Sequence, residues 1–472
     1  MPPNLIVVRI DGRGFRRFSE VHEFEKPNDE RALNLMNSCA AAMLEEYPDI
    51  VFSYGFSDEY SFVFKKTTKF YQRRASKIVS LVVSFFTSIY TTKWKEFFPH
   101  KELRYPPSFR AWVICCASME VLQTYLAWRQ NDCHINNQYN TCFWMLVKCG
   151  KTEEEAQEVL KVEAIVKYSE NGTPVKRLRR KPIIVHSDNI AARSFWNEHP
   201  FLLKELGDFR EDINNIKPEY VKSFQFENKL MPLTWIVVRI DGCHFHRFSE
   251  VHEFEKPNDE QALNLMNSCA VAVLEQFKDV IFSYGVSDEY SFVLKKDSQF
   301  YQRRGSEIVT ALVSYFTSIY VMKWKEFFPQ KELKYPPCFD GRAVLYPTSE
   351  ILRDYLTWRQ ATLTINIIPV SGCLLSLERA KSEAQAYLKG TQAREKNEVL
   401  LQQFGIDYNT LPLMFRQGSS AFWNEEEKTG MYENGASAEK SGKKVVVEQC
   451  NIIEQSFWEA HPSILNEKPH MV

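Results

Sequence analysis

Three features are scarce or missing in this sequence, and each absence narrows the class of protein. The eleven cysteines include no CxxC pair and no regular framework, so we expect reduced thiols in an intracellular protein. The longest apolar run, Ile78–Tyr90, is too short to span a membrane. The N-terminal MPPNLIVVRIDG lacks the basic segment and long apolar core of a secretory signal, so we expect a location in the nucleus, the cytoplasm or both.

The chain also lacks an excess of charge of either sign. Lys and Arg together number 59 and Asp and Glu 60, which gives a net charge of −1 at pH 7. Such a chain has no overall field to attract nucleic acid, so a nucleic-acid partner must be held by local basic patches. The 44% hydrophobic and 14% aromatic content is ample for substantial cores.

What the chain does contain is an internal repeat. VVRIDGRGFRRFSEVHEFEKPND begins at Val7, and VVRIDGCHFHRFSEVHEFEKPND begins at Val237. YGFSDEYSFVFKK at Tyr54 returns as YGVSDEYSFVLKK at Tyr284, again 230 residues later. A constant offset means that two copies of one domain are joined head to tail. The expected segments are a first domain at 1–207, a linker at 208–230 and a second domain at 231–472.

The pattern within each copy predicts the order β-α-β-β-α-β. In the first copy, strands are expected at 5–10, 50–54, 60–64 and 111–116, and helices at 32–46, at 70–98 and from Met119 onward. This order is the ferredoxin-like plan, in which the first and third strands are neighbours at the sheet centre. We therefore predict an α+β fold with two tandem polymerase-palm-like domains. Each would be an antiparallel sheet with helices on one face and the other face left for a ligand.

Acidic motifs end strands in both copies. Asp11 closes the first expected strand and Asp58 lies in the hairpin between the second and third, so the ferredoxin-like order brings both to one end of one sheet face. Carboxylates suit Mg²⁺, and two such ions can activate a hydroxyl and stabilise a leaving pyrophosphate. Taken singly, each motif also has the composition of an ordinary turn. The candidate metal ligands are Asp11, Gly12 through its carbonyl, Asp58 and Glu59, and in the second copy Asp241, Gly242, Asp288 and Glu289.

Basic and polar clusters supply further candidates. YQRRASK, at Tyr71–Lys77, opens a helix and suits a triphosphate, although a solvated basic face has the same composition. The second copy has Glu307 in place of the Lys, which would repel phosphate. His134, in HINN, suits a tRNA 5′ end or a second nucleotide, or an ordinary helix face. The cluster at Lys176–Lys181 suits a phosphate backbone or a nuclear signal, or is an exposed loop.

The motifs RIDGRGF, KPND, YGFSDEYSFVF, RRASK, YPP, WRQNDCHINNQYNTCFW and KGTQAREKNE together resemble the tRNA(His) guanylyltransferase family. The tandem arrangement is similar to the duplicated form found in plants. The resemblance implies a polymerase-like palm that adds GMP to the 5′ end of tRNA(His), at position −1, by 3′→5′ transfer. It also implies ATP activation of the 5′-monophosphate, attack by the 3′-hydroxyl of GTP, two Mg²⁺ per active site and a homo-oligomer with no membrane partner.

The same resemblance implies roles for individual residues. The metal ligands of the family match Asp11, the Gly12 carbonyl and Asp58, and its triphosphate contacts match Arg74 and Lys77. The candidate catalytic residues are Asp11, Asp58, Asp241, Asp288, His134 and Lys396. The candidate nucleotide-binding residues are Arg13, Gly14, Phe15, Ser57, Arg73, Arg74 and Lys77 in the first copy, and His244, Phe245, Ser287, Arg303 and Arg304 in the second.

Neither copy has the complete set of family motifs. The first has HINN and RRASK but lacks the KNE segment that carries Lys396, and it has FRAW at Phe109–Trp112 where the second has FDGR at Phe339–Arg342. The second lacks HINN and instead carries an apolar stretch over 362–380 that is unlike the family. The copies can therefore complete each other, with His134 from one and Lys396 from the other.

Three functions are compatible with these motifs. An active guanylyltransferase is favoured by the intact acidic motifs in both copies. A non-catalytic tRNA- or nucleotide-binding relative with a regulatory role is favoured by the missing segments. A nucleotide cyclase on the same palm plan shares the metal chemistry, but HINNQYN and KGTQAREKNE count against it.

Overall fold

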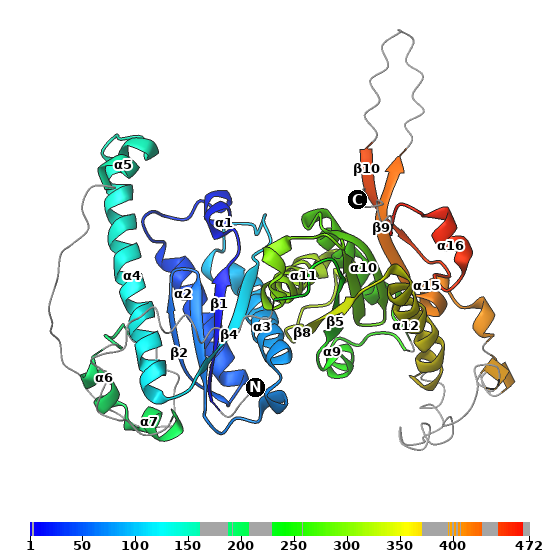
Figure 1. Cartoon of the computed structure of the whole chain (residues 1–472), viewed down its shortest axis with the longest axis horizontal. Helices are drawn as coiled ribbons and strands as arrows, with labels where there is room; N and C mark the ends of the chain where they lie inside the picture. The colour runs from blue at the N-terminus through cyan, green and yellow to red at the C-terminus, as the bar shows by residue number, and fades with distance from the viewer. Residues whose placement is uncertain are drawn as a thin grey trace, which may run out of the picture. The chain divides into compact units, whose positions relative to one another are not determined.

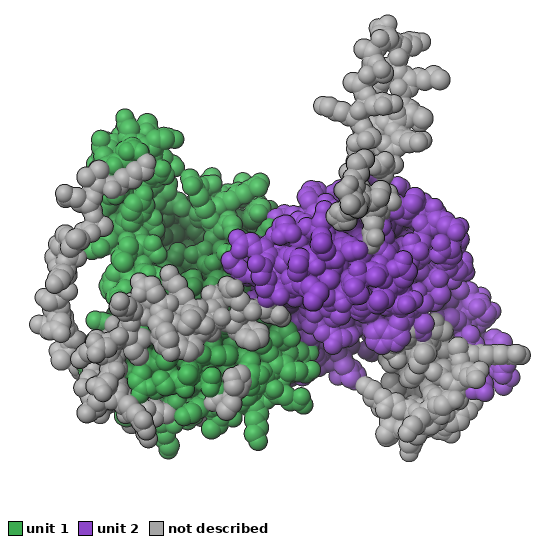
Figure 2. Space-filling model, in the orientation of Figure 1, with its two compact units in different colours: residues 1–226 green, residues 227–472 purple. Residues whose placement is uncertain are grey.

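The chain forms two compact units, residues 1–226 and 227–472, which are called the first and second unit below (Figure 2). Most of the expected linker at 208–230 lies outside the residues that the structure describes; only Lys229 and Leu230 of it are described. This computed structural model describes residues 1, 4–160, 187–190, 192–206, 229–256, 258–370, 395, 397, 398, 401, 402, 405, 407–426 and 442–465.

The first unit contains one antiparallel sheet in the strand order β2-β3-β1-β4 (Figure 1). The predicted order β-α-β-β-α-β is present, with the first and third strands adjacent at the centre. Its elements are β1 (Leu5–Gly12), α1 (Phe15–Val21), α2 (Glu30–Glu46), β2 (Ile50–Phe56), β3 (Glu59–Phe64), η1 (Phe70–Arg73), α3 (Ala75–Phe97), β4 (Phe109–Cys116), α4 (Met119–Lys148), α5 (Glu153–Leu160), α6 (Arg193–Glu198) and α7 (Pro200–Leu206).

The second unit repeats this plan and enlarges the sheet, whose order is β10-β9-β6-β7-β5-β8. Strand β9 pairs with β6, the counterpart of β2. The predicted α+β fold with two antiparallel sheets is therefore confirmed. The elements are β5 (Trp235–Gly242), α9 (Phe245–Val251), α10 (Glu260–Gln276), β6 (Val280–Val286), β7 (Glu289–Leu294), η2 (Phe300–Arg303), α11 (Gly305–Phe327), β8 (Phe339–Tyr346), α12 (Ser349–Val370), η3 (Tyr408–Thr410), α15 (Leu413–Gln417), β9 (Ser419–Glu426), β10 (Gly442–Glu448) and α16 (Gln455–Ala460).

Helices α2 and α3 pack against one face of the first sheet. Helix α3 is buried along most of its length because nearly every residue from Ile78 to Thr91 is apolar or a small hydroxyl. Helices α3 and α11 are long and apolar enough to cross a membrane by length and composition. However, 78% and 83% of their apolar windows are buried inside the protein, as expected for core helices.

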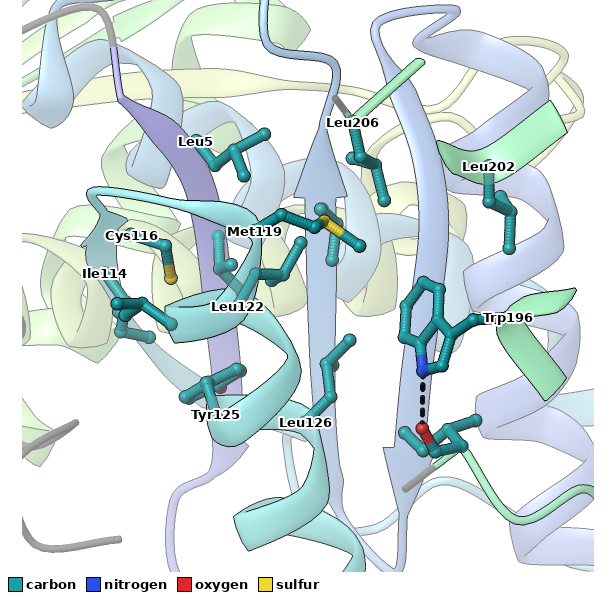
Figure 3. Close-up of a cluster of buried hydrophobic side chains, with 14 of the residues drawn as sticks. Leu5, Ile114, Cys116, Met119, Leu122, Tyr125, Leu126, Trp196, Leu202 and Leu206 are labelled. Carbon is teal, nitrogen blue, oxygen red and sulfur yellow. Dashed lines mark hydrogen bonds between the residues drawn. The ribbon is translucent and has the colours of Figure 1, made fainter. Parts of the chain in front are cut away.

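The opposite face of the sheet is also covered by helices, which corrects the expectation of helices on one face only. Figure 3 shows α4, α6 and α7 contributing side chains such as Leu122, Trp196 and Leu206 to a core with Leu5 of β1. The indole of Trp196 donates a hydrogen bond of 2.8 Å to the Ile190 carbonyl. The charged side chains of Arg9, Glu59 and Asp11 lie toward the end of this face where β1 finishes.

The start of the expected helix at 70–98 has a different backbone. Tyr71, Gln72 and Arg73 all have positive φ, at 42°, 55° and 57°, and α3 begins only at Ala75. Periodicity did not predict this turn, since the left-handed region is disfavoured for residues other than glycine. The second unit has the same turn at Tyr301–Arg303.

Candidate metal centre

The Asp11 and Asp58 carboxylates of the first unit meet at the end of β1. Asp11 is at the C-terminal end of that strand, and Asp58 lies in the tight turn between β2 and β3. The Gly12 amide donates a 3.0 Å hydrogen bond to the Asp58 carbonyl, which ties the two segments together. A Cβ at Gly12 would lie 2.5 Å from Asp58 Oδ2 and 2.5 Å from the Phe15 ring, so glycine is required for this close approach.

The carboxylates of Asp58 and Asp11 repel each other. Burial, together with the negative charge of Asp11, raises the pKa of Asp58 to about 6. The Ser57 side chain acts in the opposite direction by hydrogen bonding to this carboxylate. A buried acid held beside another acid is stabilised by a bound cation, because the cation relieves both the desolvation and the repulsion. Taken by themselves, these carboxylates are donors of the type that a hard cation such as Mg²⁺ prefers.

The second unit repeats this arrangement. The Gly242 amide donates a 3.1 Å hydrogen bond to the Asp288 carbonyl, and a Cβ on Gly242 would lie 2.7 Å from Asp288 Oδ2. Burial and the charge of Asp241 raise the pKa of Asp288 to about 6. Ser287 has a positive φ of 55°, as its counterpart Ser57 has at 52°. Among the described residues, no group of three or more His, Cys, Asp and Glu side chains is placed to hold a metal ion.

Glu59 was expected to be a metal ligand, but its carboxylate is occupied by two guanidinium groups. Arg129 on α4 donates to its two oxygens at 2.6 and 2.7 Å, and Arg9 on β1 forms a second ion pair. The side chain of Glu59 is only 6% exposed. Both oxygens are therefore committed to a buried ion pair that joins β1, β3 and α4. This corrects the expected ligand role.

Glu289 of the second unit has the same kind of environment. Arg239 contacts its Oε2 at 2.6 Å, and Arg359 of α12 contacts Oε1. The sequence did not predict that arginines would pair with these two glutamates. The four are Arg9, Arg129, Arg239 and Arg359. The signal available was WRQ, which recurs at Trp128 and Trp358, but a repeated Arg alone does not reveal a partner 70 residues away.

The two units differ at one position beside the acid pair. In the first, Arg110 on β4 lies directly opposite Asp11 in the strand register, and its Nη2 is 3.1 Å from Asp11 Oδ2. In the second, Asp340 on β8 lies opposite Asp241. Asp241 instead contacts Arg239, at 3.0 Å, from its own strand.

Two cavities of the first unit reach Asp58, one member of the acid pair. One, of about 1160 Å³, is lined by Ser57, Asp58 and His134 together with residues of α2 and β2. The other, of about 410 Å³, also reaches Ser57 and Asp58 and extends toward Lys26 and Trp144. The structure thus brings His134, an exposed residue of α4, to the same cavity as Asp58.

Arg73 and Arg303 were expected to contact a nucleotide, but both guanidinium groups hold the backbone. Arg73 donates to the carbonyls of Thr68 and Asn4, at 3.2 and 2.5 Å. Arg303 is only 2% exposed and donates to the Ser298 and Thr234 carbonyls, at 3.0 Å each. These bonds stabilise the left-handed turn. The two guanidinium groups therefore have a structural role in place of the expected role in nucleotide binding.

The basic residues at the start of α3 lie far from the acid pair of their own unit. The contact of Arg73 with Asn4 places this turn at the beginning of β1, whereas Asp11 is at its end. Seven residues of extended strand span about 23 Å. Arg74 is exposed, and the Lys77 ammonium lies 5.4 Å from the Tyr71 ring centre. These two residues therefore lie at the opposite end of β1 from the acid pair of their own unit.

The equivalent cations in the second unit are partly neutralised. Arg304 Nη1 contacts Glu307 Oε1 at 2.7 Å, and Glu307 is 6% exposed. Glu307 occupies the place of Lys77, so this helix start has a carboxylate where the first unit has an ammonium group. From the sequence we expected Glu307 to repel phosphate at this end of the second unit. Its ion pair with Arg304 is consistent with that expectation.

The residues that follow Asp11 and Asp241, also expected to bind a nucleotide, have separate structural roles. Gly14 adopts a left-handed conformation with φ 66° and caps α1, while His244 takes the same conformation with φ 56° in the second unit. Phe15 and Phe245 pack against other aromatic rings, with centroids 4.9 Å from Phe18 and from Phe248. The amide of Arg13 donates to the Ser108 carbonyl at 2.7 Å.

Some expected features cannot be placed. Lys396 and the basic cluster at 176–181 lie outside the described residues, as does most of the unusual stretch at 362–380.

A carboxylate pair at the end of a central strand, present in each of two repeated α+β units, defines a duplicated protein with two candidate metal centres. The family description "tRNAHis guanylyltransferase" matches residues 1–117 and 218–347, and a "Thg1 C terminal domain" matches residues 120–170 and 350–456. The chain belongs to the tRNA(His) guanylyltransferase family.

Individual relatives support the same assignment. The chain is 62% identical to tRNA(His) guanylyltransferase 1 of Arabidopsis thaliana, over 99% of this chain and 88% of that protein. It is 60% identical to tRNA(His) guanylyltransferase 2 of the same species, over 99% and 96% of the two chains. A probable tRNA(His) guanylyltransferase of Dictyostelium discoideum is 46% identical, and the match covers 54% of this chain but 99% of that protein. That relative therefore corresponds to about half of this chain.

Proposed function

We propose that this protein is a tRNA(His) guanylyltransferase, a nucleotidyltransferase that adds GMP to the 5′ end of tRNA(His) at position −1. The observation that carries the proposal is the match to relatives with this name over almost the whole chain, together with an acid pair in both units. The substrates would be tRNA(His) and GTP, with ATP activating the 5′-monophosphate. The two expected domains would each act as a polymerase-palm-like platform.

The residues that would hold two Mg²⁺ in an active unit are the acid pair and the glycine carbonyl between them. In the first unit these are Asp11, Asp58 and Gly12, and in the second Asp241, Asp288 and Gly242. Bound Mg²⁺ supplies charge that favours deprotonation of an attacking hydroxyl and departure of pyrophosphate.

The remaining groups bind and position substrates in this proposal. His134 lines the cavity that reaches Asp58, so a nucleotide or tRNA end in that cavity can contact both. Arg74 and Lys77 lie at the opposite end of the sheet. In this proposal they bind a substrate phosphate at that end of the sheet, and the protein acts as a homo-oligomer.

The decisive experiment is transfer of labelled GTP to 5′-monophosphorylated tRNA(His) with the purified full chain. We expect one added GMP. Replacing all four acids with Asn (Asp11, Asp58, Asp241 and Asp288) should abolish transfer. The matched control replaces two equivalent exposed acids that lie before β4 and β8, Glu102→Gln with Glu332→Gln, and should retain transfer. No product from the full chain, with a single-copy relative active in parallel, would refute the proposal.

A second candidate is a non-catalytic tRNA- or nucleotide-binding relative. The ion pair between Arg110 and Asp11 favours it for the first unit, because a guanidinium group competes with metal for that carboxylate. The same assay separates the two functions. Retention of tRNA(His) on the protein without transfer of GMP would favour this candidate.

A further inference from the structure

We infer that divalent metal binding is confined to the second unit, because Arg110 of the first unit is a built-in cation that takes the place of the metal beside Asp11. The inference deepens the proposed function by assigning the metal-dependent chemistry to one unit, and it rests on that function for the role of the acid pairs.

The strand register places opposite charges at the same position of the two units. Arg110 on β4 is the direct neighbour of Asp11 on β1, and Asp340 on β8 is the direct neighbour of Asp241 on β5. Residues directly opposite each other on antiparallel strands project from the same face and have Cα atoms about 4.5–5.5 Å apart. The side chain at this position therefore acts directly on the acid pair.

The cation in the first unit is held firmly against its acid. Arg110 Nη2 is 3.1 Å from Asp11 Oδ2, and both side chains are about three-quarters buried, at 27% and 24% exposed. Arg110 is the second residue of β4 and is paired with β1 in the sheet, so its backbone is fixed by the strand rather than by a loop. A metal ion at Asp11 has to displace this guanidinium group or accept repulsion from it.

The acid of the second unit is more accessible to a metal. Asp241 is 37% exposed, and its cation partner Arg239 lies 3.0 Å away. Arg239 is shared, since it also contacts Glu289 at the shorter distance of 2.6 Å. Displacing Arg239 from Asp241 leaves it with a carboxylate partner, so the exchange of this cation for a metal costs little.

The balance of charge around the two acid pairs points the same way. At seven matching positions the first unit has three Arg and three acids, whereas the second has three Arg and four acids; Asp132, which contacts Arg129, is a further acid of the first unit. The positions are Arg9, Asp11, Asp58, Glu59, Arg110, Trp112 and Arg129 in the first unit, and Arg239, Asp241, Asp288, Glu289, Asp340, Arg342 and Arg359 in the second. At the position directly beside the first acid, Asp340 attracts a divalent cation whereas Arg110 repels it. Asp340 contributes through its charge, since it is not placed as a third ligand.

The test is Mn²⁺ binding to the full-length protein, measured by the electron paramagnetic resonance signal of free Mn²⁺. We expect Asp241→Asn with Asp288→Asn to weaken the tightest binding by at least roughly tenfold. Adding Arg110→Asp to that double variant should restore a tight site, now in the first unit. Arg110→Gln preserves most of the side-chain volume and should restore part of it, which guards against a folding defect in the Asp variant.

The reverse exchange is the matched control. Asp340→Arg in the otherwise natural chain should weaken Mn²⁺ binding by at least roughly tenfold, and Asp340→Asn by less. Thermal unfolding of every variant verifies that it is folded. The inference is overturned if the Asp241→Asn, Asp288→Asn chain binds Mn²⁺ as tightly as the natural chain, or if neither Arg110 variant strengthens binding. It is also overturned if the natural chain has no tight Mn²⁺ site.

This readout is independent of the proposed reaction. A chain that transfers GMP to tRNA(His) but binds Mn²⁺ equally well in both units refutes the inference and leaves the function intact. A chain that binds Mn²⁺ only in the second unit but transfers nothing supports the inference and refutes the function.

Discussion

At the scale of single residues, Asp58 and Asp288 are the proposed metal ligands, and each lowers the stability of the metal-free protein at neutral pH. Each is a buried acid whose pKa is raised to about 6, by burial and by its neighbouring Asp. The folded, metal-free protein therefore keeps a proton that the unfolded chain has lost. Stability due to this group falls as the pH rises from about 4 to about 6, and the loss remains above that range.

Replacing Asp58 with Asn should consequently stabilise the metal-free protein. At pH 7.5 in EDTA we expect a gain of roughly 1–3 kcal/mol in the free energy of unfolding, and at pH 4 almost none, because the natural side chain is then neutral. Denaturant titrations at the two pH values measure the difference. The exposed acid Glu20, changed to Gln, is the control and should show no such pH dependence. Destabilisation of the Asn variant at pH 7.5 would contradict the assignment.

The sequence was sufficient to find these acids but not their neighbours. Asp11 and Asp58 recur 230 residues later in identical motifs, so repetition alone singles them out. The difference between Arg110 and Asp340 is visible in the sequence, yet its consequence depends on the register of β1 with β4. Residues 99 positions apart are brought together by the fold, and no local pattern encodes that pairing.

At the scale of elements, the buried ion pair of Glu59 connects β3 to α4. Replacing Glu59 with Gln leaves the Arg129 guanidinium, 4% exposed, without its anionic partner. We expect a loss of about 3–5 kcal/mol in the stability of the first unit. The double replacement Glu59→Leu with Arg129→Met removes both charges and should recover much of that loss. Equal stability of the Gln variant and the natural chain would show that the pair is not structural.

Helix α1 is joined to the segment before β4 by a buried histidine. His22 Nδ1 donates to the Phe18 carbonyl at 2.9 Å, and its Nε2 accepts from the Arg104 amide at 3.1 Å. Nε2 must remain unprotonated to accept this bond, and burial lowers the pKa of His22 below its ordinary value of 6.5. The same arrangement is present at His252, whose pKa is lowered for the same reason.

These two histidines should make stability sensitive to acid. Below pH 6.5 these histidines bind protons in the unfolded chain but remain neutral in the folded protein. Their contribution to the free energy of unfolding is therefore fully present above that pH and is lost as the pH falls. We expect His22→Gln with His252→Gln to be less stable at pH 7.5 but to lose less between pH 7.5 and pH 5.5. Urea midpoints at the two pH values test this, and an unchanged pH dependence would exclude the histidines as its source.

Most elements were predictable because their patterns are strong. The four strands and the helices at 32–46 and from Met119 have alternating or helical apolar patterns, and the structure has them nearly as expected. The left-handed turn at Tyr71–Arg73 was not, since it is stabilised by a guanidinium bond to Asn4 rather than by local propensity. The covering of the second sheet face also escaped prediction, because α6 and α7 reach it from far along the chain.

At the scale of the whole molecule, the duplication allows the units to diverge. Each has its own sheet and its own apolar core, so one can lose a function that the other retains without loss of fold. The first unit has a cation beside its acid pair and keeps Lys77 at the other end of the sheet. The second has the opposite charges at both places, Asp340 and Glu307. With metal bound in the second unit, as inferred above, this divergence would separate metal binding from phosphate binding.

Calorimetry of the full chain should reveal this separation as two unfolding transitions with different responses to metal. Glu59→Gln should lower the unfolding temperature of the first unit only, and Glu289→Gln that of the second only, which assigns the two transitions.

Metal at 100 times its dissociation constant stabilises the state that binds it by about 2.7 kcal/mol. For a unit of this size that corresponds to a rise of roughly 5–11 °C in Tm, at about 2–4 °C per kcal/mol. We expect Mn²⁺ to raise the second unit's transition and leave that of the first in place, because Arg110 already supplies the first unit's cation. In the Arg110→Gln chain both transitions should rise, whereas equal shifts in the natural chain would show that both units bind metal.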